Sequence, residues 1–294
     1  MKILITGGSG LLGQYLNIEL SKKHELLTLF NANPGNCKNY NSLRTDIADY
    51  DTLFEIFTIF KPDIVIHTAA VSNAQKADDL PKEIVDKVNI HTTKRIAELC
   101  DTFSAKLIFT STDLVYDGNY GSLLNETSPL NPISFYAETK LKAESVIQNT
   151  FDNYVILRTA LLFGCGLNHS KNHFQEILNK LKNNQPVKLF IDQYRTPLAL
   201  HDAARIISGL IDGNRSGEII NFGGNERVSR FELGEILCEE GGYDKSLLIK
   251  SQMKDLTGIY PVADVSMNID KLKSFGTEPG SIRQTIREIL MNLS

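Results

Sequence analysis

The chain has 294 residues, of which 42% are hydrophobic, and a formal charge of -4 at neutral pH. A chain of this length buries about three quarters of the surface that its unfolded form exposes, so we expect one large domain or two closely joined ones. Lys and Arg are scattered rather than gathered into the basic stripe that nucleic acid binding requires, which excludes nucleic acid as an expected partner. No stretch has the apolar length of a signal peptide or a membrane span, so the sequence predicts a cytoplasmic protein without membrane contact.

Short, nearly continuously apolar segments alternate with helical patterns along the first half of the chain. We expect strands at residues 2–6, 25–30, 63–70, 106–112 and 154–160. We expect helices near residues 11–22, 49–60, 81–102 and 135–150. Parallel strands that are buried on both faces are apolar throughout. The alternation therefore predicts an α/β fold, a doubly wound parallel sheet of the Rossmann type.

A glycine-rich turn, "TGGSGLLG", follows the first expected strand and opens the first expected helix. Gly7, Gly10 and Gly13 are spaced three residues apart. Many tight strand-to-helix turns need glycine for backbone reasons alone, but glycine also lets the backbone approach a pyrophosphate held by the N–H groups of the helix that follows. Because the strand and the helix are both in place, the motif predicts dinucleotide binding.

The end of the second expected strand bears on the choice of cofactor. A free ribose 2′-hydroxyl is usually bound there by an acidic residue. This chain has Phe30, Asn31 and Ala32 instead. We therefore expect NADP(H) as the preferred cofactor, with NAD(H) as the alternative.

The regular alternation fades after residue 160, where a smaller region is expected to begin. We assign residues 1–160 to a dinucleotide-binding domain and residues 161–294 mainly to a substrate-binding region, with a return segment near residues 200–222. Within that region Ser229 and Glu232 form a capping-box pattern, which predicts a helix that begins at residue 230.

The stretch "SFYAETKLKAE" places Tyr136 and Lys140 four residues apart on an expected helix. A Tyr and a Lys at this spacing can also be an ordinary pair on a helix surface without a function. Its position is more informative, because the helix starts near the carboxyl ends of the strands, where open α/β sheets bind ligands. A nearby ammonium should lower the pKa of the Tyr136 phenol by about 1 to 3 units and so prepare it for proton transfer. Thr112, at the end of the fourth expected strand, is placed to present its hydroxyl to the same carbonyl oxygen.

Together, "TGGSGLLG", "STDLVYDG" and "YAETK" resemble the extended short-chain dehydrogenase/reductase family, and most closely its dTDP-4-dehydrorhamnose reductase (RmlD-like) group. The resemblance implies that Tyr136 protonates the substrate oxygen, that Lys140 binds the nicotinamide ribose and that Thr112 orients the carbonyl. It also implies cofactor contacts along one edge of the sheet, from Gly7, Gly10, Leu11, Leu12, Gly13, Asp46, Ile47, Ala69, Ala70 and Asn89.

The departures from the family pattern fall mainly on the substrate side. Leu161 stands where a Trp commonly contacts substrate, and Leu114 stands where a Tyr is frequent. Asp192 and Gln193, in "DQYRTPL", are candidates for substrate contact, although a turn role is an equal alternative.

Two classes of function follow from these residues. The first is an NADP(H)-dependent reductase of a keto-sugar nucleotide, with a sugar-nucleotide epimerase or dehydratase as a weaker variant. The second is a cofactor-binding regulatory subunit, because the regulatory subunit of methionine adenosyltransferase resembles the same family. The resemblance allows a homodimer.

The remaining cysteines and histidines favour structural interpretations. His67 lies in an apolar strand and is expected to be a hydrogen-bonded core residue. His169 and His173 lack the acidic partner of a helical zinc motif, so no metal site is expected. The cysteines are widely spaced and are expected to be buried free thiols: Cys37, Cys100, Cys165 and Cys238.

Overall fold

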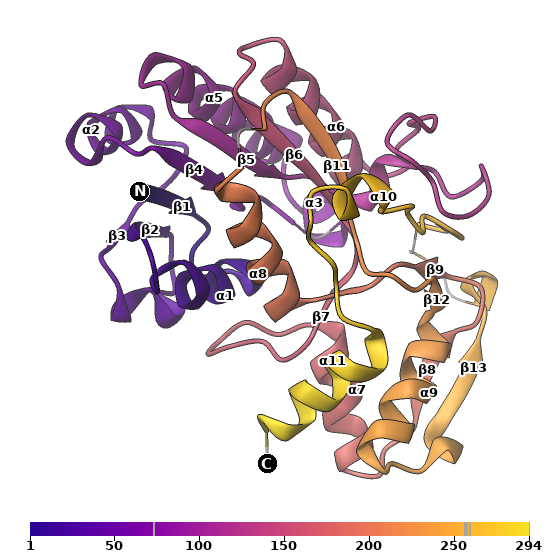
Figure 1. Cartoon of the computed structure of the whole chain (residues 1–294). Coiled ribbons are helices and arrows are strands. Elements are labelled where there is room, and N and C mark those ends of the chain that lie inside the picture. Colours follow the sequence, from indigo (N-terminus) through magenta and orange to yellow (C-terminus); the bar gives the residue numbers. More distant parts are fainter. Residues whose placement is uncertain (73, 214, 256–257, 259, 294) are drawn as a thin grey trace.

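A seven-stranded parallel sheet forms the centre of the computed structural model, which describes residues 1–72, 74–213, 215–255, 258 and 260–293. The strand order is β11-β6-β5-β4-β1-β2-β3 (Figure 1), and each neighbouring pair is parallel. The strands are β1 (Lys2–Thr6), β2 (Glu25–Phe30), β3 (Ser42–Arg44), β4 (Ile64–His67), β5 (Lys106–Thr110), β6 (Tyr154–Thr159) and β11 (Glu218–Phe222).

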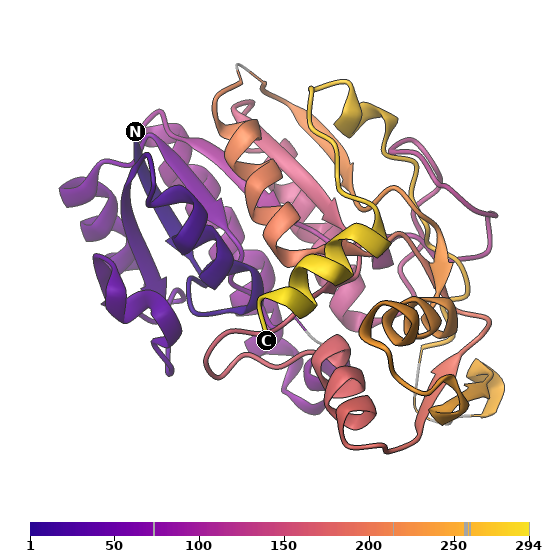
Figure 2. The same cartoon turned by 60° about the horizontal axis from the view of Figure 1, so that its bottom comes forward.

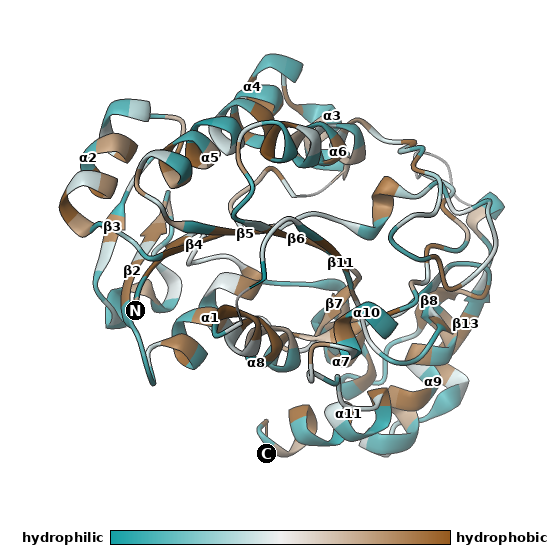
Figure 3. Cartoon of the chain, turned by 45° about the horizontal axis from the view of Figure 1, so that its top comes forward, coloured by the Kyte–Doolittle hydropathy of each residue, from teal (hydrophilic) through white to brown (hydrophobic). Residues whose placement is uncertain are grey.

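Helices cover both faces of this sheet, because successive strand residues point to opposite faces. Ile3 and Ile5 pack with α1 (Leu11–Leu20) and α8 (Leu200–Ile211) on one face. On the other face Leu4 packs with α2 (Tyr50–Phe60), α5 (Thr92–Thr102) and α6 (Phe135–Gln148). Figure 3 shows the apolar strands between these two helical layers. The predicted doubly wound α/β fold is confirmed.

The structure also has elements that the sequence analysis did not predict. β3 is a three-residue edge strand of mostly exposed residues, so it carries no apolar run. β11 lies at the other edge, within the segment in which a return to the first domain is expected. The helix expected over residues 81–102 is broken by a π-helical turn at Lys87–His91, between α4 (Lys82–Asp86) and α5.

A second core joins the elements of the C-terminal region, which lies beside the carboxyl ends of the strands (Figures 1 and 2). This core includes α7 (His173–Lys182), β8 (Val187–Phe190), α9 (Arg230–Gly241), β13 (Leu248–Ser251) and α11 (Ile282–Met291). The helix predicted at residue 230 is confirmed, since Ser229 Oγ accepts from Glu232 N at 3.1 Å and Glu232 Oε2 accepts from Ser229 N at 2.6 Å.

Smaller elements connect the two regions. Two short strand pairs lie between the cores: β7 (Leu162–Phe163) with β10 (Leu198–Ala199), and β9 (Tyr194–Arg195) with β12 (Val228–Ser229). The short helices are α3 (Ala74–Asp79), α10 (Asp270–Lys273) and the 3-10 turns Gly35–Asn39, Asp113–Val115, Lys245–Leu247 and Met253–Asp255. Among the helices described, none is both long and apolar enough to cross a bilayer.

Candidate active site

A cavity of about 670 Å³ runs along the carboxyl ends of the strands, and the glycine-rich turn forms part of its wall. Gly7 has a φ of 71°, and Gly10 N donates to Gly7 O at 2.9 Å, which closes the turn. Gly13 packs so tightly that a Cβ there would lie 2.2 Å from Gly7 O. Gly10 caps α1, so the N–H groups of Leu11 and Leu12 have no acceptor within the helix. A pyrophosphate fits such donors at the positive end of a helix.

One end of the cavity is formed where β2 and β3 finish. Asn31, Asp46 and Ile47 line it, and Asp46 Oδ1 accepts from Ala48 N at 2.9 Å. Arg44 Nε donates to the carbonyl oxygen of Asn31 at 3.1 Å. The Arg44 guanidinium therefore lies beside the end of β2 but is not among the lining residues, while the Asp46 carboxylate lines this end of the cavity.

The wall between the two ends follows β4. Ala69, Ala70 and Val71 line the cavity there. Asn89 is buried and is not among the lining residues; its side chain accepts from Val71 N at 2.8 Å and donates to Val71 O at 3.2 Å and to Thr139 Oγ1 at 2.9 Å. Asn89 therefore holds Val71 in place from behind the cavity wall and does not itself line the cavity.

The other end of the cavity contains Thr112, Tyr136 and Lys140 together. Thr112 follows β5, while Tyr136 and Lys140 lie one turn apart on α6, which begins after Ser134 with Ser134 Oγ accepting from Ala137 N. Tyr136 is 8% exposed and Lys140 is 3% exposed. The structure therefore brings together the three residues that the sequence marks as catalytic candidates.

The electrostatics of this end differ from the expectation. Burial raises the pKa of Tyr136, the Asp113 carboxylate raises it further, and a hydrogen bond with Thr112 opposes the shift. The prediction that Lys140 lowers the tyrosine pKa is therefore wrong for this structure. Burial lowers the pKa of Lys140 to about 7, against an opposing effect of the Glu144 carboxylate. Tyr136 keeps its proton at neutral pH, which suits a proton donor better than a base.

Three charged side chains beside these residues were not predicted as site residues: Asp113 and Arg195, which are buried, and Arg230, which is half-buried. Asp113, Arg195 and Arg230 all line the cavity, and Arg195 Nε lies 3.5 Å from Asp113 Oδ2. Burial lowers the pKa of Arg230 to about 10, and Arg195 lowers it further. Two guanidiniums against one carboxylate leave this end of the cavity positive, which suits an anionic group of a ligand.

No local pattern could have paired the two arginines. Arg195 lies in β9 and Arg230 begins α9, and they come together because β9 pairs antiparallel with β12, with Ser229 opposite Tyr194. Arg195 lies within "DQYRTPL", and Arg230 directly follows Ser229 of the capping-box pattern. An arginine in each of these two stretches was the signal available in the sequence.

The three residues predicted to contact substrate have different positions. Leu161 lines the cavity. Gln193 Oε1 accepts from Arg230 Nε at 3.0 Å, and both carboxylate oxygens of Asp192 accept from Met253 N at 3.1 Å. Neither Asp192 nor Gln193 is among the lining residues, so Gln193 supports Arg230 and Asp192 anchors a loop.

A second cavity of about 440 Å³ adjoins the first, with Leu161 and Arg230 in both walls. Lys171 and His173, at the start of α7, also line it. The Lys171 ammonium therefore extends the positive end of the large cavity, whereas desolvation lowers the pKa of His173.

Comparison with known proteins places this architecture in a family. The model of the RmlD substrate binding domain matches residues 1–294. The chain belongs to this family. It is 25% identical over 302 residues to the dTDP-4-dehydrorhamnose reductase of Aggregatibacter actinomycetemcomitans, with 98% of each chain covered. The predicted resemblance is confirmed.

Two further relatives of this RmlD-family chain bear on its function. The dTDP-4-dehydrorhamnose reductase of Bacillus anthracis, solved in complex with NADP, superposes with a TM-score of 0.83 at 20% identity and covers 100% of this chain and 99% of its own. The methionine adenosyltransferase 2 subunit beta of Bos taurus is 22% identical over 283 residues, which are 94% of this chain and 82% of its own. The chain is thus similar both to reductases and to a methionine adenosyltransferase subunit, and the prediction of an oxidoreductase agrees with the reductases.

The remaining histidines and cysteines of this RmlD-family chain have mainly structural surroundings. His67 is buried between Thr6 Oγ1, 2.6 Å from Nδ1, and Thr93 Oγ1, 3.0 Å from Nε2, which confirms its interpretation as a core residue. His169 and His173 are exposed. Within the described ranges, no group of three or more His, Cys, Asp or Glu could hold a metal ion. The thiols of Cys37, Cys100 and Cys238 are buried, and Cys165 is half-buried.

Proposed function

We propose that this protein is an NADP(H)-dependent reductase of a keto-sugar nucleotide, similar to dTDP-4-dehydrorhamnose reductase. One observation carries the proposal: Thr112, Tyr136 and Lys140 meet at one end of a cavity whose wall also contains the Gly7–Gly13 turn. A dinucleotide bound along that wall would bring its nicotinamide beside a proton donor. The reductase relatives support this assignment.

The chain's own groups fit the dinucleotide. The free N–H groups of Leu11 and Leu12 would hold the pyrophosphate, and Ala69 and Ala70 leave room for its middle. When bound, NADPH supplies the hydride. Preference for NADP(H) over NAD(H) is supported by Arg44, since its guanidinium lies at the end of β2 where a 2′-phosphate would need positive charge.

Tyr136 is the proposed general acid. Its phenol stays protonated at neutral pH, so it can donate its proton to the carbonyl oxygen as negative charge develops there. The Thr112 hydroxyl donates a second hydrogen bond to the same oxygen and orients it. Lys140, which lines the same end of the cavity, holds the nicotinamide ribose with its amino group.

Arg195 and Arg230 are the proposed anchors for the substrate's diphosphate. Arg195 is buried and Arg230 is half-buried, and partial exclusion of water strengthens a charge-assisted hydrogen bond to phosphate oxygens. Asp113 orients Arg195, and Gln193 orients Arg230. The second cavity, with Lys171 and His173, takes the remainder of the nucleotide.

A second function remains as a candidate, that of a cofactor-binding regulatory subunit. It is favoured by one observation, the 22% identity to the methionine adenosyltransferase 2 subunit beta. Such a subunit would bind NADP(H) without oxidising it in the presence of any keto-sugar nucleotide.

The deciding experiment is a scan of keto-sugar nucleotides for consumption of NADPH, followed by its absorbance. We expect turnover with at least one substrate and at least tenfold tighter binding of NADPH than of NADH, which corresponds to about 1.4 kcal/mol. Tight NADPH binding without turnover across the scan would favour the regulatory subunit.

A further inference from the structure

A buried carboxylate lies directly behind the proposed reacting residues. Glu144 follows Lys140 by four residues on α6, so the two side chains share one face of the helix. Glu144 is 1% exposed, and Lys140 is also buried. A carboxylate is rarely enclosed to this degree unless its oxygens are satisfied by partners.

The partners of Glu144 fix its position. Ser111 Oγ donates to Glu144 Oε1 at 2.5 Å, and Arg158 Nη2 donates to Glu144 Oε2 at 2.9 Å. Ser111 directly precedes Thr112, and Arg158 belongs to β6. The carboxylate therefore ties α6 to the ends of β5 and β6 at the level of the proposed active site.

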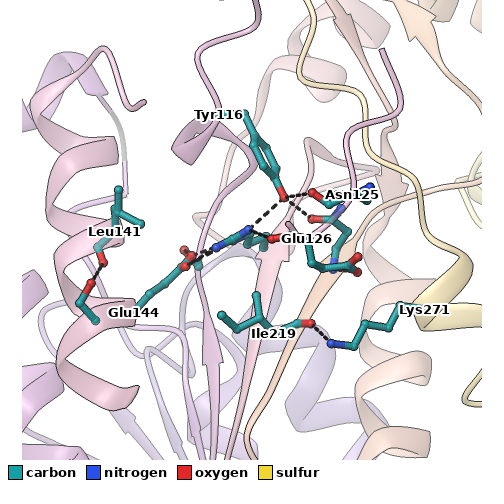
Figure 4. Close-up of polar contacts among 11 residues, drawn as sticks. Tyr116, Asn125, Glu126, Leu141, Glu144, Ile219 and Lys271 are labelled. Carbon is teal, nitrogen blue, oxygen red and sulfur yellow. Dashed lines mark hydrogen bonds and ion pairs between the residues drawn. The ribbon is translucent and has the colours of Figure 1, made fainter. Parts of the chain in front are cut away.

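A larger polar network holds the arginine in turn. Arg158 Nη1 donates to Tyr116 Oη at 3.0 Å and to the carbonyl oxygen of Glu126 at 2.9 Å, and Tyr116 Oη donates to Asn221 Oδ1 at 2.9 Å. Figure 4 shows the Glu144 carboxylate and the Tyr116 hydroxyl on opposite sides of the guanidinium that joins them. Because every member is held by another, the carboxylate has little freedom to turn away from its site.

The surroundings of Lys140 explain why this carboxylate matters. The Lys140 Nζ lies 4.0 Å from the centre of the Phe109 ring on β5. On β4, His67 is neutral near pH 7, because burial and Lys140 lower its pKa to about 3. Tyr136, on α6 itself, is neutral as well. Of the groups that act on the pKa of Lys140, Glu144 is the one that raises it against burial.

We propose that Glu144 is a positioning residue that acts through Lys140: its buried carboxylate keeps the lysine in the ammonium form inside the cavity. The role rests on the proposed function, since the ammonium is the form that would bind the ribose hydroxyls with all its hydrogens as donors. Arg158 and Ser111 hold the carboxylate in place for this task. A purely structural ion pair would tie α6 to β6 equally well but would leave the charge of Lys140 unchanged.

The test is the titration of Lys140 itself, followed by carbon-13 NMR of lysine Cε, with Lys140→Met identifying the signal. In the wild type the midpoint should lie near 7. Glu144→Gln should lower the midpoint by at least about 1 unit, because an opposite charge at this range is removed. This readout needs neither cofactor nor turnover, so a failure of the reductase proposal and a failure of this one can be told apart.

The matched control is Tyr116→Phe, which breaks the same buried network at Arg158 but keeps the carboxylate. The Lys140 titration of this variant should have the same midpoint as that of the wild type. If Glu144→Gln does not fold because Arg158 is left unpaired, the double variant Glu144→Gln with Arg158→Met is compared with Arg158→Met, so that the two proteins differ only in the carboxylate.

The consequence for binding gives a second readout. Glu144→Gln should bind NADPH more weakly than the wild type at pH 7, and the deficit should shrink below the midpoint of the variant, where Lys140 is charged again. An unchanged midpoint in Glu144→Gln, an equal midpoint in the double variant and Arg158→Met, or an equal drop in Tyr116→Phe would overturn the proposal.

Discussion

Tyr136 and Lys140 lie one helical turn apart in the same cavity, yet burial moves their pKa values in opposite directions. The phenol holds its proton more firmly than a free tyrosine does, while the amine changes charge near pH 7. A neutral proton donor thus stands next to a group that can become cationic. This pairing suits reduction of a carbonyl, in which the oxygen gains a proton.

The glycine-rich turn can be tested by two substitutions with different expected effects. A Cβ at Gly10 would meet only Gly7 O, at 3.1 Å, whereas a Cβ at Gly13 would lie 2.2 Å from the same atom and 2.7 Å from Gly8 Cα. Gly10→Val should therefore leave the fold intact but cover the free N–H groups, and NADPH affinity should fall at least about tenfold. Gly13→Ala should instead lower the free energy of unfolding by about 1–3 kcal/mol.

Titration calorimetry for affinity and urea denaturation for stability separate these outcomes. Undiminished NADPH affinity in a folded Gly10→Val variant would mean that the turn serves the backbone alone.

The arginine pair should govern the substrate and not the cofactor. Arg230→Gln removes a charged donor, a loss of about 1.5–3 kcal/mol, so KM for the sugar nucleotide should rise about tenfold to a hundredfold with NADPH affinity retained. Arg205→Gln is a suitable control, because Arg205 pairs with Asp202 on α8 and does not line the cavity. A KM that stays at the wild-type value in Arg230→Gln would argue against a diphosphate at this site.

Lys140 should make the stability of the folded protein depend on pH. Its pKa is about 7 in the folded chain against 10.5 for a free lysine, so between these values the unfolded chain binds more protons. The free energy of unfolding should therefore rise with pH in this window, by at most about 1.4 kcal/mol per pH unit from this one group. The Lys140→Met variant should lack this pH-dependent contribution to the free energy of unfolding.

Urea denaturation of both proteins at several pH values between about 7 and about 10 measures the difference. The wild type should gain stability relative to the variant as pH rises, and parallel curves would show that burial does not lower the pKa of Lys140.

Much of the fold could be predicted because its strands are buried on both faces. The segments that became β1, β2, β4, β5 and β6 are apolar enough to be recognised without any contact information. β3 escaped prediction because its three residues have no core contact that demands an apolar run. The position of a strand at a sheet edge depends on its neighbour rather than on its own sequence.

The site was predictable where a motif is local and not where it depends on the fold. Thr112, Tyr136 and Lys140 are fixed by one strand end and one helix. Arg195 and Arg230 meet only through the β9–β12 pairing. The Tyr136 pKa was predicted in the wrong direction because spacing indicates a neighbouring charge but not the burial of the phenol, which has the larger effect.

The most direct test of the central claim is turnover by Tyr136→Phe beside the wild type, once the scan has supplied an active keto-sugar nucleotide. The substitution removes one hydroxyl, so the fold and NADPH affinity should be nearly unchanged, while kcat should fall about 10²- to 10⁴-fold. Single-turnover consumption of NADPH is the measurement, because it isolates the chemical step. A loss in that range with NADPH affinity preserved is the result that the reductase assignment predicts. A Tyr136→Phe variant that consumes NADPH at the wild-type rate would contradict it.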